Sequence, residues 1–145
     1  MRLAALSLFV LLCAACNASS QSVWDKPPAE TVTVPASSVR VVDGDTFRAN
    51  GDKIRLIGWD TPEEGRTRKC DAERELGRKA TAAAKQLIEN AETVSFIFEG
   101  RDRYDRALAH VALNASTDIG AALEAQGLAQ RWDYDAGDRK PVWCD

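Results

Sequence analysis

The sequence predicts an α+β domain built around a small, closed antiparallel β-barrel of five strands, with two to three helices. Five short segments have strand-like patterns and are separated by turn residues. Two segments have helical patterns, one between the third and fourth strands and the other after the fifth. The chain has 145 residues, which suits one compact domain once an N-terminal targeting segment is set aside.

A hairpin is the best-defined part of the predicted barrel. The first three strands are expected over residues 39–42, 46–49 and 53–57. Asn50 and Gly51, between the second and third strands, are a preferred pair for a two-residue type I′ turn. That turn sets a register in which Thr46 lies opposite Arg55 and apolar pairs share one face. Arg55 is thereby carried to the open end of the hairpin.

Two carboxylates are expected at the same end of the hairpin. Asp45 comes one residue before the second strand, and Asp60 follows the third strand by a few residues. Because hairpin strands are antiparallel, both positions lie beside Arg55. The sequence therefore predicts a polar cluster at one end of the barrel.

The longest predicted helix serves packing. Asp71 can cap a helix that runs to about Asn90. The apolar positions that follow the spacing of a core-facing stripe are Ala72, Leu76, Ala80, Ala83, Leu87 and Ala91. The remaining predicted elements are strands over 93–99 and 107–113 and a helix over 118–126. Gly127 ends that helix, and the chain is expected to be irregular from Leu128 onward.

The N-terminal part predicts export. Residues 1–16 have the basic start and short apolar run of a signal peptide, and the run is too short to span a membrane. Its end resembles a bacterial lipobox, which would make Cys16 the lipidated residue and a membrane tether. A plain signal-peptidase cut near Ala18 or Ser20 also fits. We therefore expect either a periplasmic or cell-envelope lipoprotein or a secreted protein.

A flexible linker is expected over residues 17–35, because this stretch is rich in Ser, Pro, Thr and Asn and has no sustained period. Trp24 and the alternation of Val32 with Val34 also fit a short strand. Residues 36–145 are then the folded domain.

Two cysteines remain in the predicted domain, Cys70 and Cys144. Two thiols in an oxidising compartment favour one disulfide, although two free thiols are the alternative. The chain-entropy model values a bridge over so long a loop at about 4 kcal/mol.

The charge balance excludes binding of nucleic acid by bulk positive charge. The formal net charge is −3, so any hold on phosphate must come from local clusters of arginine and lysine.

The polar cluster offers the groups that phosphodiester hydrolysis needs. Asp45, Asp60 and the Thr61 carbonyl form a sparse all-oxygen site of the kind that suits calcium. Without Cys or His at metal-binding spacing, zinc is not expected. Arg55 and Arg106 each present a planar fork of donors to phosphate. Glu63 is the candidate base for the attacking water.

Four stretches together resemble the thermonuclease family, whose type member is staphylococcal nuclease. They are Val42-Asp43-Gly44-Asp45-Thr46, Arg55-Leu56-Ile57-Gly58-Trp59-Asp60-Thr61-Pro62-Glu63, Asp102-Arg103-Tyr104-Asp105-Arg106 and Gln126-Gly127-Leu128-Ala129. The resemblance implies an OB-like five-stranded barrel, calcium on Asp45, Asp60 and Thr61, phosphate on Arg55 and Arg106, and Glu63 as base. It also implies cleavage of DNA and RNA to 3′-phosphate ends, with Tyr104 beside the bound nucleotide.

This sequence departs from the family pattern in two places. Asp105 stands where the family usually has Gly, which adds negative charge beside Arg106. The tyrosine-bearing stretch that lines the type member's nucleotide pocket is not reproduced around residues 131–135. The competing hypotheses are a non-catalytic OB-like module that binds nucleic acid or protein, and an envelope lipoprotein whose barrel binds partners. A monomer is expected in each case.

Overall fold

The computed structural model describes residues 29–144. The predicted signal peptide, lipidation at Cys16 and most of the predicted linker lie outside this range. In this part of the chain, none of the helices combines the length and apolar character needed to cross a membrane.

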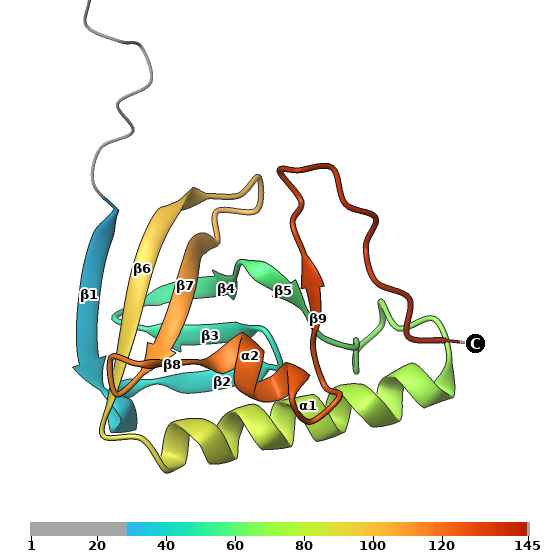
Figure 1. Cartoon of the computed structure of the whole chain (residues 1–145), viewed down its shortest axis with the longest axis horizontal. Coiled ribbons are helices and arrows are strands. Elements are labelled where there is room, and N and C mark those ends of the chain that lie inside the picture. Colours follow the sequence, from blue (N-terminus) through green and yellow to red (C-terminus); the bar gives the residue numbers. More distant parts are fainter. Residues whose placement is uncertain (1–28, 145) are drawn as a thin grey trace, which may run out of the picture.

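The described residues form a mixed α+β fold. Its strands are β1 (Glu30–Pro35), β2 (Arg40–Asp43), β3 (Thr46–Ala49), β4 (Asp52–Leu56), β5 (Gly58–Asp60), β6 (Thr93–Arg101), β7 (Ala107–Leu113), β8 (Thr117–Asp118) and β9 (Gln130–Trp132). Its helices are α1 (Asp71–Glu89), α2 (Ile119–Glu124) and the 3₁₀ turn η1 (Ala36–Ser38). Figure 1 shows α1 running along the lower side of the strands, next to α2 and β2.

The sheet differs from the predicted barrel. Its strand order is β1-β6-β7-β4-β3-β2, with β8 added beside β7, while β5 pairs with β9 in a separate two-stranded sheet. The β4–β7 pair is parallel and the other pairs are antiparallel. Within residues 29–144, β1 and β2 are the outer strands and do not pair with each other. The predictions of five strands, of purely antiparallel pairing and of a closed barrel are therefore wrong.

Residues 30–35 are a strand and not the end of a linker. β1 pairs along its whole length with β6, from Glu30 opposite Phe98 to Pro35 opposite Thr93. Val34 is buried and Val32 packs against the core, so the valine alternation seen in the sequence marks a half-buried strand. The predicted linker boundary at residue 35 is corrected to a point before residue 30.

The predicted hairpin register is confirmed. Thr46 lies opposite Arg55, Phe47 opposite Ile54, and Ala49 opposite Asp52. Asn50 and Gly51 have φ of 50° and 88°, the left-handed conformation at both positions that a type I′ turn requires.

Helix α1 follows the predicted range, and the predicted stripe packs against the core at Leu76, Ala80, Ala83, Leu87 and Ala91, while its most buried residues lie about one position further along. Its N-cap is Cys70, whose Sγ accepts a hydrogen bond from the Glu73 amide at 3.3 Å, and not Asp71. The buried helix residues are Glu73, Gly77, Ala80, Thr81, Ala84 and Ile88. A Cβ at Gly77 would lie 2.7 Å from the Glu64 backbone nitrogen, so the loop after Asp60 packs directly on the helix. The most buried residues of the helix therefore lie about one position after those of the predicted apolar stripe.

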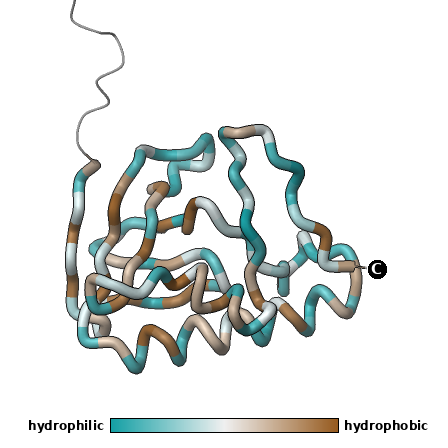
Figure 2. The backbone as a smooth tube through the Cα atoms, viewed as in Figure 1, coloured by the Kyte–Doolittle hydropathy of each residue, from teal (hydrophilic) through white to brown (hydrophobic). Residues whose placement is uncertain are grey.

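The core lies between the strands and α1. Its largest fully buried apolar side chains are Phe47, Phe96, Ile54, Leu56, Ile119, Leu123, Val94 and Val111. Hydrophobic residues recur along β1, β6 and α1 (Figure 2). A Cβ at Gly120, the second residue of α2, would lie 2.1 Å from the Trp59 ring. This close packing of Trp59 on α2 fixes β5, the strand that carries Asp60.

The predicted disulfide is confirmed. Cys70 and Cys144 are joined with a Cα–Cα distance of 6.1 Å. The bridge fastens residues 133–144, which we call the strap, to the N-terminal end of α1.

Candidate active site

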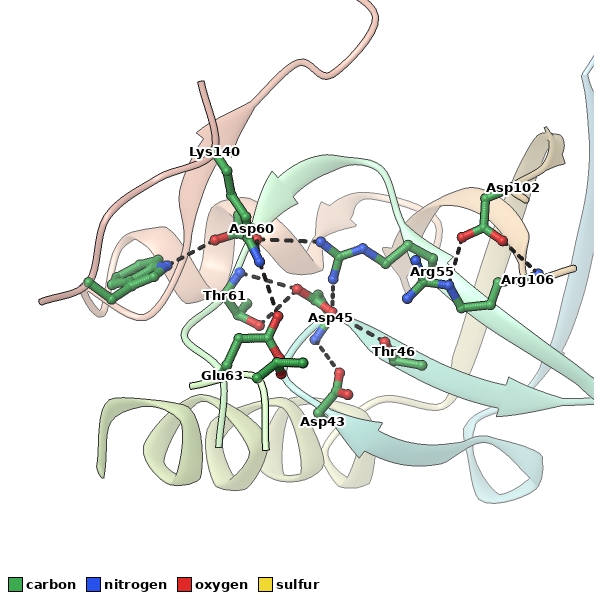
Figure 3. A network of polar contacts seen from close by, with 12 residues as sticks. Asp43, Asp45, Thr46, Arg55, Asp60, Thr61, Glu63, Asp102, Arg106 and Lys140 are labelled. Carbon is green, nitrogen blue, oxygen red and sulfur yellow. Dashed lines mark hydrogen bonds and ion pairs between the residues drawn. The ribbon is translucent and has the colours of Figure 1, made fainter. Parts of the chain in front are cut away.

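Asp45 lies at the centre of a cluster of polar side chains (Figure 3). The Leu56 amide donates to the Asp45 carbonyl at 2.9 Å, which ties the start of β3 to the end of β4. Asp45 Oδ1 forms an ion pair with the Arg55 guanidinium and accepts a hydrogen bond from the Thr46 hydroxyl at 3.2 Å. Asp45 Oδ2 accepts from the Thr61 hydroxyl at 3.0 Å and from the Thr61 amide at 3.2 Å. The Asp45 carboxylate is buried, and both of its oxygens have hydrogen-bond or ion-pair partners.

Asp60 is the second buried carboxylate, with a relative exposure of 0%. Its Oδ2 accepts a hydrogen bond from Trp143 Nε1 at 2.9 Å. Its Oδ1 has no well-directed hydrogen bond; two cations approach it, Lys140 Nζ at 3.3 Å and an Arg55 terminal nitrogen at 3.5 Å. Burial raises the pKa of Asp60 above its ordinary value, although Trp143 and Lys140 oppose the shift.

Arg55 joins the two carboxylates. Its two terminal nitrogens face Asp45 and Asp60 separately, and its side chain is only 12% exposed. Burial lowers the pKa of Arg55, while the charge of Asp60 raises it and the nearby charge of Arg106 lowers it further. A guanidinium remains a cation through such a shift because its ordinary pKa is so high.

Glu63 lies at the edge of the cluster and is partly exposed. Lys140 Nζ lies 3.0 Å from Glu63 Oε1, and the Thr67 hydroxyl donates to Oε2 at 2.9 Å. Burial alone would raise the pKa of Glu63, but the hydrogen bonds from Lys140 and Thr67 outweigh it and hold the pKa below its ordinary value. The Glu73 carboxylate accepts from the Glu63 amide at 3.4 Å, which helps to fix this loop on α1.

Arg106 lies on the far side of Arg55 from the carboxylates (Figure 3). Its Nε is 2.7 Å from Asp102 Oδ2, and its amide donates to Asp102 Oδ1 at 3.0 Å. Asp105 has φ of 60°, a left-handed conformation that explains why glycine suits this position. Its carboxylate lies 3.6 Å from Arg101, and the Arg101 guanidinium also donates to the Asp105 carbonyl. The positive charge of Arg101 therefore partly offsets the negative charge of Asp105.

A groove of about 820 Å³ runs beside Arg55 and Arg106. Aromatic rings line it: Tyr104 from the β6–β7 loop, Trp59, and Trp132 and Tyr134 from β9 and the strap. Tyr104 and Tyr134 are 66% and 73% exposed. Arginine side chains lie over the Tyr104 and Trp59 rings. The aromatic lining that appeared to be missing around residues 131–135 is thus supplied by Trp132 and Tyr134.

The predicted site residues form two groups joined by Arg55. Asp45, Asp60, Thr61 and Glu63 lie on its inner side, whereas Arg106 and Tyr104 lie along the groove. Asp45, Asp60 and Glu63 do not line the groove. Arg55 therefore connects the acidic cluster to the groove.

The donor set fits a hard cation. Asp45 and Asp60 offer carboxylate oxygens, and the poorly satisfied Asp60 Oδ1 is a buried acceptor that a metal could complete. In the part of the chain that the structure describes, the three-residue group with ligand atoms all within 4.8 Å is Cys70, Glu73 and Cys144, and both of its cysteines are in the disulfide. This leaves no thiolate for zinc among these residues. Among the described residues, the carboxylates of Asp45, Asp60 and Glu63 do not come together within this distance.

Sequence reasoning missed four residues of this region. Lys140 and Trp143 reach Asp60 from the strap, and Trp132 and Tyr134 enlarge the groove. The disulfide prediction contained a usable signal, because joining Cys144 to Cys70, seven residues after Glu63, places the preceding residues near the cluster. The three-residue strand β9 carried no such signal, since it is short and mostly polar.

Comparison with known proteins agrees with this geometry. The model of the staphylococcal nuclease homologue family matches residues 53–141, which is more than half of the chain. The chain belongs to this family. The matched range includes Arg55, Asp60, Glu63, Arg106 and Lys140, whereas Asp45 lies before it.

Individual relatives of this family member are distant. A thermonuclease of Staphylococcus intermedius is 31% identical over 105 residues, 69% of this chain and 61% of the relative. An uncharacterised protein of Methanocaldococcus jannaschii is 35% identical over 103 residues, 56% of this chain and 49% of the relative. The succinoglycan biosynthesis protein ExoI of Rhizobium meliloti is 29% identical over 118 residues, which are 78% of this chain and 53% of the relative. The chain thus spans about half to three fifths of the curated relatives that it matches.

Proposed function

We propose that this chain is an exported, calcium-dependent nuclease that hydrolyses phosphodiester bonds of DNA and RNA with little dependence on sequence. One observation carries the proposal: a single buried guanidinium, Arg55, contacts both Asp45 and Asp60 and lines a groove of aromatic, arginine and acidic side chains. A purely structural ion pair would not need to lie at the edge of such a groove. Membership of a nuclease family supports the same activity.

Calcium would be held by Asp45, Asp60 and the Thr61 carbonyl. Hard cations prefer oxygen ligands and tolerate irregular sites that waters complete. When bound, the ion would polarise a phosphoryl oxygen and offset the negative charge that develops on it. Thr61 is fixed for this role because both its amide and its hydroxyl donate to Asp45.

Glu63 would act as the general base. Its pKa is held below the ordinary value by its hydrogen bonds despite partial burial, so it is ionised at neutral pH and able to accept a proton. The water oxygen forms a bond to phosphorus as Glu63 takes its proton. The bond from phosphorus to the 5′ oxygen breaks, and that oxygen takes a proton from a solvent water as it leaves, while Glu63 returns its proton to solvent. The expected products carry 3′-phosphate and 5′-hydroxyl ends.

The two arginines would hold the phosphate. Each guanidinium offers parallel donors that match two nonbridging oxygens. Asp102 keeps Arg106 extended by binding both its Nε and its amide. The charge that develops on the phosphate would then meet donors that are already in position, which is the largest single contribution in many enzymes.

The groove would bind the polynucleotide through base stacking. The exposed rings of Tyr104 and Tyr134, with the half-buried ring of Trp132, offer π-faces to any base. Stacking is tolerant of sequence, and the groove needs no 2′-hydroxyl contact for it, so both DNA and RNA fit the site. The net charge of −3 leaves the local arginines as the source of phosphate attraction.

Export and monomeric state belong to the same proposal. The disulfide between Cys70 and Cys144 suits an oxidising compartment, which agrees with a periplasmic or cell-envelope lipoprotein anchored at Cys16 or with a secreted protein. Nothing in the mechanism requires a second copy of the chain.

The direct test is incubation of the purified protein with plasmid DNA and with RNA, in calcium or in excess chelator. We expect both polymers to be degraded in calcium and to survive in chelator. Asp45→Asn should raise the calcium concentration needed for half-maximal cleavage, because it removes one anionic ligand. If neither polymer is cleaved in calcium while the protein still retards both in a gel, the chain is a non-catalytic binding module.

A further inference from the structure

The strap contacts both carboxylate oxygens of Asp60. Trp143 Nε1 donates to Oδ2 at 2.9 Å, and Lys140 Nζ lies 3.3 Å from Oδ1. The same ammonium lies 3.0 Å from Glu63 Oε1, and Figure 3 shows it above the acidic cluster. A charged group from the strap thus lies where a cation bound to Asp60 would have to approach.

The strap is fixed at both of its ends. Strand β9 pairs with β5 immediately before it, with Trp132 opposite Gly58. Cys144 is bonded to Cys70 at the start of α1. Between these points, the Trp132 indole donates to the Asp138 carbonyl at 3.1 Å. Because the segment is closed into a loop, the Lys140 ammonium is held near Asp60 at a high effective concentration.

The charges around Asp60 indicate that the Lys140 ammonium lies close to where a divalent ion would bind. The three carboxylates of the cluster, Asp45, Asp60 and Glu63, face two cations, so Lys140 reduces the net charge of the cluster from −2 to −1 without any ion. Asp60 Oδ1 has charged neighbours but no well-directed hydrogen bond. A metal ligand distance of about 2.3 to 2.6 Å from this oxygen would place a divalent ion within a few ångströms of the ammonium. Like charges at such a distance repel strongly in a poorly solvated site.

We propose that Lys140 is a tethered competitor of the divalent cation at Asp60, and that the Cys70–Cys144 bridge determines how strongly it competes. This inference rests on the proposed function, because it concerns the same carboxylate. Lys140 is a positioning residue that sets the affinity of the site for the cation. Binding of the cation requires the ammonium to leave Asp60 Oδ1, and the bridge limits how far it can move. Opening the bridge allows the strap to leave.

Calcium affinity measured by titration calorimetry with calcium chloride, on the purified protein, tests this role independently of catalysis. Lys140→Met removes the charge and keeps an apolar stem. We expect it to lower the calcium dissociation constant by about tenfold or more. Lys140→Arg keeps the charge and should bind calcium as the wild type does. Lys85→Met, on the exposed face of α1, changes the net charge equally and should leave the affinity unchanged.

The bridge is tested with Cys70→Ser combined with Cys144→Ser. Serine at position 70 retains the preferred chemistry of an N-cap, and circular dichroism confirms that the variant is folded at the temperature of the titration. This variant should also bind calcium more tightly than the wild type. Adding Lys140→Met to the double serine variant should lower its calcium dissociation constant little further, because both changes remove the same competitor.

The outcomes separate this inference from the proposed function. Equal calcium affinity in the wild type and Lys140→Met would overturn the competition and leave the calcium site standing. Weaker binding in Lys140→Met would overturn it as well, since Lys140 would then support the cation. Absence of calcium binding in every variant would overturn both proposals.

Discussion

Arg55 and Asp60 meet inside the protein, with an Arg55 terminal nitrogen 3.5 Å from Asp60 Oδ1 while the other terminal nitrogen is paired with Asp45. Both carboxylates that the proposal gives to calcium are therefore partners of the guanidinium that it gives to phosphate. A cation bound at Asp45 and Asp60 would balance their negative charge and would leave Arg55 free to face the groove. The proposed cation and phosphate sites would then be coupled through this one side chain.

Arg55→Lys should not preserve activity. A lysine ammonium is a compact point charge and cannot present the planar pair of parallel donors that the guanidinium offers to a phosphate. We expect kcat/KM for plasmid DNA to fall by about 10²- to 10³-fold, as when one preorganised transition-state donor is removed. Thermal unfolding must show that the variant is folded. A rate close to that of the wild type would mean that bidentate contact is not needed.

Glu63→Gln should abolish the base and spare the fold. Glutamine has nearly the same shape and keeps one oxygen that can accept from either Lys140 or Thr67, but it cannot take a proton. We expect kcat to fall by about 10²- to 10⁴-fold, with calcium affinity by calorimetry little changed. Glu75→Gln, on the exposed side of α1, is the matched control and should retain full activity. If Glu63→Gln turns over normally, another group accepts the proton.

The hairpin and its cluster could be predicted from the sequence because local chemistry decides them. Asn50-Gly51 specifies the turn, the turn specifies the register, and the register places Arg55 beside Thr46 and Asp45. The groove depended on long-range pairing. β9 is three residues long and pairs with β5 across about seventy residues of chain. The local sequence around Trp132 and Tyr134 therefore does not predict where these side chains lie.

Strand β1 shows a different limit of prediction from the sequence. Ser, Pro and Thr are typical of linkers, and they outweighed the Val32 and Val34 alternation in the prediction. The pairing partner β6 decides the outcome, because its residues from Thr93 to Phe98 pair with the whole of β1. The predicted stripe of α1 packs against the core except at Ala72. It missed Gly77 for a similar reason: this residue faces inward because the Pro62–Glu64 backbone packs on it, which no helical periodicity reveals.

Tyr134→Ala should weaken substrate binding more than turnover. Its ring lines the groove, is 73% exposed and is not part of the core. Loss of one stacked base costs about 1 to 3 kcal/mol, so we expect KM for single-stranded DNA to rise by about fivefold or more with kcat nearly unchanged. Val142→Ala is the control, because this exposed strap residue does not line the groove. Equal KM values in both variants would exclude stacking at Tyr134.

Asp102→Asn should remove a pH-dependent part of the stability. Burial raises the pKa of Asp102, but hydrogen bonds from the Arg106 amide and guanidinium outweigh it and hold the pKa below its ordinary value. An acid with a depressed folded-state pKa stabilises the fold above its unfolded value, about 3.9, and loses this contribution as the pH falls through the folded-state value. In urea unfolding, the variant should be less stable than the wild type near neutral pH, and the two should converge in acid. A difference that stays constant with pH would rule out the ionised Asp102 as its source.

A structure of the protein with calcium and a nucleotide bisphosphate tests the central claim most directly. The account predicts one calcium ion on Asp45 and Asp60, Arg55 and Arg106 on the phosphate, and the Lys140 ammonium displaced from Asp60. Arg55 still paired with both carboxylates and a phosphate bound elsewhere would contradict it.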